Sequence, residues 1–156
     1  MTAMMQAKES PVVGFLGELD MGLQRALLDG SRRERYGPGA MMVHAYGEAR
    51  LLLIHRGLAQ VRALSRDGRS ATVRYIGEDE FVGLPSTVAG SSPVGAQAVT
   101  ECDVTSLNPE RVRAIAVANA EVAWCIAREL ARMSYESKEF LNNSLFGSVD
   151  ERVARH

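Results

Sequence analysis

The sequence predicts a mainly β protein with flanking helices, and three observations lead to this fold class. Short runs containing Val, Leu and Ile, such as AMMVHAY and SATVRYI, are separated by the turn signals GPG, YGE, RDG and GEDE. A helical repeat of apolar residues precedes this region. A second helical pattern follows it from residue 108 onward. The strand-rich middle is therefore expected to form a meander, sandwich or roll that helices from both ends cover.

The composition is that of one ordinary globular domain. The 156 residues include 24% charged and 46% hydrophobic residues, with a formal net charge of −1. This charge argues against a chain that grips nucleic acid through phosphates, and the apolar runs are too short to span a membrane. The N-terminus lacks an export signal, and Cys102 and Cys125 form neither a disulfide framework nor a metal set. We expect a cytoplasmic protein with reduced thiols and no membrane partner.

The first predicted helix covers residues 15–28. Its apolar residues recur every four positions and form one stripe, with Gly30 as a stop signal. The stripe consists of Phe15, Leu19, Leu23 and Leu27. Residues 1–12 are polar and rich in Met, so they are expected to be a flexible N-terminus.

Alternation along the strands predicts which side chains face the core. In both AQVRALS and SATVRYI, an arginine stands between two apolar residues. Neighbouring residues of a strand point to opposite faces, so the apolar pair shares one face and the arginine lies on the other. The residues expected to point inward are Ala59, Val61, Val73 and Tyr75. Arg62 and Arg74 are expected to face solvent.

The segment FVGLPSTVAGSSPVGAQAV, residues 81–99, has the composition of an anion-binding loop without its cation. It holds three glycines, two prolines and four hydroxyl residues but no charge. Glycine lets backbone N–H groups close around a phosphate, yet such a cradle normally adds an Arg or Lys. The sequence therefore predicts a concave pocket that has no charge to match a phosphate.

Helices are predicted at 108–119 and over about 120–143. Asn108 is a cap and Pro109 occupies the first helical position, whereas the second pattern has no internal Gly or Pro. Steps of four and three in the second pattern have coiled-coil spacing, which predicts a homodimer seam. The seam residues would be Ile126, Leu130, Met133, Ser137 and Phe140. The alternative is that this stripe packs on the chain's own roll.

A further helix is predicted to begin at FGSVDERVARH. Ser148 and Glu151 have the spacing of a capping box, and the chain ends two turns later at His156. We expect a sequence cut short before the next domain is complete.

This layout resembles the Crp/Fnr family of bacterial transcription regulators over about residues 30–156. The most telling pieces are RDGRSATVRYIGEDEFVG, which is similar to the family's hairpin, and FGSVDERVARH, which is similar to the junction after its dimer helix. The resemblance implies a cupin-like β-roll of the cyclic-nucleotide-binding type at 13–118 and a dimerisation helix at 119–145. It also implies that 146–156 begin a DNA-binding helix-turn-helix domain, most of which is missing.

The resemblance further implies where an effector would bind. Phe81 and Gly83 match the family's pattern, but Leu84 stands where nucleotide-binding members have Glu, and Val94 and Gly95 stand near their Arg-Ser pair. Cyclic AMP is therefore not the expected ligand, and an apolar or weakly polar one is. The expected lining is Gly83, Leu84, Pro85, Ser86, Val94 and Gly95, closed by Val61, Val73, Tyr75 and Ser137, with Lys138 as a nearby cation. In the competing outcome, Leu84 and Val94 fill the space themselves.

No cofactor and no enzymatic activity are expected. The N-terminus lacks the cysteines that iron–sulfur members carry. His44 and His55 are interpreted as strand residues, with haem ligation as the alternative, and no spacing suits a cupin-like metal enzyme. The expected function is the sensor and dimerisation part of a regulator with an unknown small-molecule effector. The alternative is a stand-alone roll that binds a ligand or a protein without a DNA role.

Overall fold

The computed structural model describes residues 14–154, with side chains described up to residue 145. The expected flexible segment 1–12 lies outside this range. The strands are β1 (Arg32–Tyr36), β2 (Met41–Val43), β3 (Leu51–Arg56), β4 (Ala59–Leu64), β5 (Ser70–Ile76), β6 (Phe81–Val82), β7 (Val94–Ala98) and β8 (Cys102–Leu107). The helices are η1 (Gly14–Glu18), α2 (Met21–Leu28), α3 (Leu84–Ala89), α4 (Pro109–Ala118) and α5 (Ala120–Ala154).

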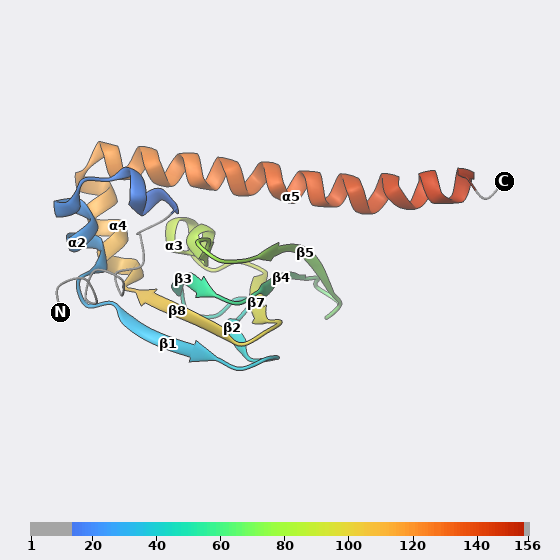
Figure 1. Cartoon of the computed structure of the whole chain (residues 1–156), viewed down its shortest axis with the longest axis horizontal. Helices are drawn as coiled ribbons and strands as arrows, with labels where there is room; N and C mark the ends of the chain where they lie inside the picture. The colour runs from blue at the N-terminus through green and yellow to red at the C-terminus, as the bar shows by residue number, and fades with distance from the viewer. Residues whose placement is uncertain (1–13, 155–156) are drawn as a thin grey trace, which may run out of the picture.

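The strands form two antiparallel sheets, in the orders β1-β8-β3-β6 and β2-β7-β4-β5. The helices of both chain ends gather at one end of the roll, and α5 then runs across it and past β5 (Figure 1). This arrangement confirms the predicted fold class, a β-roll with flanking helices and a long C-terminal helix.

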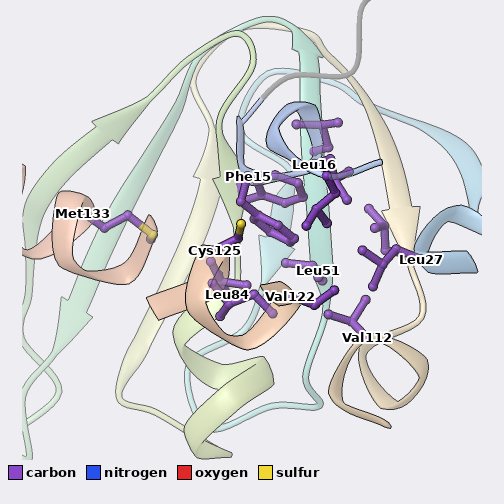
Figure 2. Close-up of a cluster of buried hydrophobic side chains, with 14 residues drawn as sticks. Phe15, Leu16, Leu27, Leu51, Leu84, Val112, Val122, Cys125 and Met133 are labelled. Carbon is purple, nitrogen blue, oxygen red and sulfur yellow. The ribbon is translucent and has the colours of Figure 1, made fainter. Parts of the chain in front are cut away.

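Strand β3 joins two cores, which explains why LLLI is apolar at every position. Leu51 and Leu53 contact a helical core, whereas Leu52 and Ile54 contact the interior of the roll. A strand covered on both faces has no polar side to show. The helical core also includes Phe15, Leu16, Leu27, Leu84, Val112, Val122 and Cys125 (Figure 2). Val122 and Cys125 belong to α5, and this helix also contributes Met133, which lies farther along the roll (Figure 2).

The first helix is shorter than predicted. Residues 14–18 form a 3-10 turn, and α2 begins only at Met21. Asp20 causes this break because its side chain accepts a hydrogen bond from the Leu23 N–H at 2.8 Å, which is how an N-cap starts a helix. Phe15, Leu19 and Leu27 are nevertheless buried, as the apolar stripe predicted.

A β-bulge overturns the predicted facing of strand β5. Val61 pairs with Arg74 and Arg62 pairs with Thr72, so Val73 is an extra residue between them. One extra residue exchanges the two faces of a strand. Arg74 is therefore 5% exposed and Tyr75 is 49% exposed, the opposite of the prediction. Ala59 and Val61 on β4 are buried as predicted.

Arg62 also departs from the expectation of a solvent-facing side chain. It is partly buried and donates hydrogen bonds to Ser70 at 2.5 Å and to Gln97 at 3.4 Å. These partners lie on the neighbouring strands β5 and β7, so Arg62 joins three strands on their outer side.

The C-terminal helices differ from the prediction only at their end. The Asn108 side chain accepts hydrogen bonds from the N–H groups of Glu110 and Arg111, as the predicted cap requires. Helix α5, however, continues to Ala154 through the helix start predicted at Ser148. A single Gly147 costs a helix about 1 kcal/mol without breaking it, which is consistent with an unbroken backbone. Within the described range, no helix is long and apolar enough to cross a membrane.

Candidate ligand pocket

A cavity of about 410 Å³ lies between the roll and α5, within the range of sizes common for small-molecule sites. Strand residues form one wall, the start of α3 forms the rim, and α5 forms the opposite wall. The lining residues are Val43, Val61, Val73, Arg74, Ile76, Val82, Gly83, Pro85, Ser86, Ser92, Val94, Gly95, Ala96, Leu130, Met133, Ser134 and Ser137.

Most of the residues predicted from the sequence lie in this lining. They are Val61, Val73, Gly83, Pro85, Ser86, Val94, Gly95 and Ser137. Val94 borders the cavity without filling it.

Leu84, Tyr75 and Lys138 are corrections, because none of them lines the cavity. Leu84 is fully buried in the helical core. Tyr75 points outward through the bulge and meets the Phe140 ring edge-on, with 6.1 Å between ring centroids. Lys138 is exposed on the far side of α5.

Gly83 explains why Leu84 leaves the pocket. It has φ +88° and caps α3, and a Cβ there would lie 1.8 Å from the Arg50 carbonyl oxygen. Only glycine fits this close approach in the left-handed region. The tight turn that follows sends the Leu84 side chain towards the helices.

The hydroxyl groups of α3 hold the helix itself rather than an open anion cradle. Ser86 and Thr87 donate hydrogen bonds to the Gly83 carbonyl at 3.0 and 2.9 Å. At the other end, the Thr87 carbonyl accepts two bonds from Arg113 on α4, at 3.1 and 2.7 Å. The segment 81–99 therefore contains a short helix, α3, that is held at both ends, and the pocket lies beside it.

Arg74 is the site residue that sequence reasoning missed. It is the single charged residue among the lining residues described above. Its Nη1 donates to the Met133 carbonyl at 3.5 Å, and Nη2 lies 3.6 Å from Glu80 and 3.5 Å from Glu136. Within the described range, Nε and Nη2 have no hydrogen-bond partner. The bulge at Val73 turns the Arg74 side chain towards the pocket, and the alternation of residues in the sequence does not reveal a bulge.

A second arginine, Arg132 on α5, holds the carboxylates around Arg74. It pairs with Glu129 and Glu136 one turn away on the same helix and lies 3.7 Å from Glu80. The hydrogen bonds that Arg132 donates to the Glu129 carboxylate raise the pKa of Arg132 above its ordinary value, against the effect of burial. Glu136 bonds to Arg132 and Glu80 accepts a hydrogen bond from the Gly77 N–H at 2.6 Å, and the contacts of both carboxylates with Arg74 are too long for good hydrogen bonds.

The other candidate groups lie outside this pocket. His55 shares a hydrogen bond with the Thr105 hydroxyl at 2.6 Å, and His44 is exposed. Cys102 and Cys125 are free and buried, and burial raises the pKa of both thiols. No group of three or more potential metal ligands occurs in the described part of the chain.

A model of the cyclic nucleotide-binding domain matches residues 33–119, from within β1 to the end of α4. The chain belongs to this family. No curated protein sequence matches it.

Solved structures share the fold of this cyclic nucleotide-binding domain. A putative transcriptional regulator of the Crp/Fnr family from Eubacterium rectale matches 94% of the chain at TM-score 0.77 and 18% identity. The catabolite activator protein of Thermus thermophilus matches 88% at TM-score 0.65 and 23% identity. A regulatory subunit of a cAMP-independent protein kinase A from Trypanosoma brucei matches 84% at TM-score 0.65 and 21% identity.

The cyclic nucleotide-binding domain described here corresponds to part of each of these proteins. It spans 69% of the Eubacterium regulator, 64% of the Thermus protein and 47% of the Trypanosoma subunit. These matches confirm the resemblance to Crp/Fnr regulators at the level of the fold.

Proposed function

We propose that the chain is the sensor and dimerisation part of a DNA-binding transcription regulator of the Crp/Fnr type, with an effector other than cyclic AMP or cyclic GMP. One observation carries the proposal: the pocket is shared between the roll and α5. Leu130, Met133, Ser134 and Ser137 of α5 form one of its walls. A ligand in the pocket therefore contacts the helix directly and changes the relative free energies of its positions.

The rejection of cyclic nucleotides is argued from the missing anchors. Leu84, at the Glu position of nucleotide-binding members, is buried in the helical core, and Val94 offers no charge to a phosphate. The guanidinium that does line the pocket, Arg74, already faces two carboxylates. A cyclic phosphate would add a further negative charge beside them, which costs free energy in a partly buried site.

The proposed dimer uses a different face of α5 from the one the sequence predicted. Ile126 and Met133 are buried in the chain's own core, Leu130 and Ser137 line the pocket and Phe140 meets Tyr75. These residues pack on the roll, as in the alternative interpretation of the stripe. An adjacent face of α5 carries exposed residues at coiled-coil spacing. They are Trp124, Ala127, Ala131, Ser134, Lys138 and Leu141, which we call the outer stripe.

Ser134 connects the two roles of α5, because it lies on the outer stripe and also borders the pocket. A dimer along this stripe would place two pockets beside its axis. In the proposed regulator, each chain carries a helix-turn-helix domain after the far end of α5, and the two domains of the dimer bind DNA together. No catalytic role and no cofactor are proposed.

A fusion experiment tests this function. Residues 1–156 are joined to a monomeric helix-turn-helix domain that binds its palindromic operator only as a dimer. The proposal expects operator binding and repression of a reporter gene, because α5 would bring two heads together. A fusion that is well expressed yet monomeric and inactive would instead support the stand-alone binding module.

A further inference from the structure

The pocket combines apolar walls with one buried guanidinium, Arg74, whose single hydrogen bond and two ion pairs are all long. An arginine side chain has five N–H donors. At Arg74, Nη1 makes a long bond of 3.5 Å to a backbone carbonyl, while Nε and Nη2 have no hydrogen-bond partner in the part of the chain that is described. Buried donors without acceptors cost free energy. A ligand that supplies an acceptor would remove this cost, so Arg74 is a natural anchor for a polar group.

The charges around Arg74 decide what kind of acceptor fits. The cluster contains two arginines, Arg74 and Arg132, and three glutamates, Glu80, Glu129 and Glu136, so its formal charge is +2 − 3 = −1. A carboxylate or phosphate would raise the negative charge further in a partly buried site. A carbonyl oxygen would accept hydrogen bonds from the unpaired N–H groups of Arg74 without adding charge.

We propose that the pocket binds a neutral amphiphile, with an apolar body and one carbonyl-type oxygen that accepts hydrogen bonds from Arg74. This inference rests on the proposed sensory role of the pocket and names the chemical class of its effector. Val61, Val94 and Leu130 offer the body an apolar surface. Nε and Nη2 are shielded in the structure, so the proposal requires the guanidinium to turn towards the cavity when the ligand enters.

The remaining polar groups favour a ligand with few polar atoms. The Ser86 hydroxyl is engaged with the Gly83 carbonyl, and the Ser92 hydroxyl accepts from the Val94 N–H at 3.3 Å. Ser134 and Ser137 lie on α5, across the cavity from the strands. A sugar or nucleotide, which needs many partners, would leave several of its groups unpaired.

Calorimetry with matched probes tests the proposal on the protein of residues 1–156. Octanamide and octanoate have similar size and differ in charge at neutral pH. Octanamide should bind, and octanoate should bind more weakly. Arg74→Met keeps an apolar stem and removes the donors, so it should weaken octanamide binding about tenfold or more. Arg62→Met is the matched control: it removes an arginine from the neighbouring strand that does not line the cavity, and should bind octanamide as the parent does.

Three results would overturn the proposal: tighter binding of octanoate than of octanamide, equal octanamide binding by Arg74→Met, or no binding of either probe to the parent protein. If Arg74→Met fails to fold, the Arg74 Nε–H resonance of the parent protein gives the answer by NMR. It should shift when octanamide is added, and an unchanged resonance at saturation would count against the proposal. The operator assay uses neither probe, so an active fusion with no octanamide binding would remove this inference and leave the proposed function intact.

Discussion

At the scale of single residues, the extra residue Val73 decides that Arg74 lines the pocket and that Tyr75 does not. Ala59 and Val61 face the core because their strand is regular up to that point. Arg74 and Tyr75 were assigned to the wrong faces because Val73 forms a bulge, and bulges depend on pairing with a distant strand. The charged residue of the pocket could therefore not be predicted from alternation, although its apolar residues could.

His55 gives a prediction about pH at this scale. Its pKa is lowered, mainly because burial disfavours the charged ring and also because Arg33 repels it, while Asp79 and Asp103 act in the opposite direction. The unfolded chain then binds a proton more readily than the folded one. The His55 contribution to stability is complete above its unfolded pKa of about 6.5 and is lost as the pH falls below that value.

Urea unfolding at pH 7.5 and pH 5.0 measures this effect. The parent protein should lose stability on acidification, and His55→Gln should lose less. His44→Gln is the control, because it makes the same substitution at an exposed position. Identical pH dependence in the parent and His55→Gln would contradict the assignment.

At the scale of elements, local signals were sufficient where a cap or turn is complete in the sequence. The Asn108 cap formed as predicted, whereas the helix expected at 15–28 broke because Asp20 is also a good cap. In α5 the sequence leaves open which face packs on the roll. The predicted seam and the outer stripe have nearly the same spacing, and only contact with the roll decides that Ile126 and Met133 face inward.

Gly83 is the element-scale prediction, because it sets the start of α3 and the rim of the pocket. Gly83→Ala would place a Cβ 1.8 Å from the Arg50 carbonyl oxygen in addition to straining φ. We expect a loss of more than the roughly 1–3 kcal/mol of backbone strain alone, measured as the free energy of unfolding in urea. Gly68→Ala, in the turn between β4 and β5, is the control. It has φ +86° and no atom within 4 Å of an added Cβ, so it should show strain alone. Equal losses for the two variants would rule out the steric explanation.

At the scale of the whole molecule, α5 is the element that closes both the helical core and the pocket. One face of this helix packs on the chain, and the adjacent face carries the outer stripe. A ligand that takes hydrogen bonds from Arg74 would also loosen its contact with Glu136 on α5. In the proposed dimer, the same helix would carry the effect of ligand binding from the pocket to the partner chain.

The dimer prediction follows from this division of α5 into two faces. Ala131 is exposed at the middle of the outer stripe and points away from the roll. Ala131→Glu would bury like charges from two chains against each other, so the dimer should dissociate while each roll stays folded. Sedimentation velocity should show monomers, with an unchanged circular dichroism spectrum. Asn143→Glu is the control: it adds the same charge at an exposed position off the stripe and should remain dimeric. A dimer that survives Ala131→Glu would show that the chains associate through another surface, and the pocket would then lie away from the dimer axis.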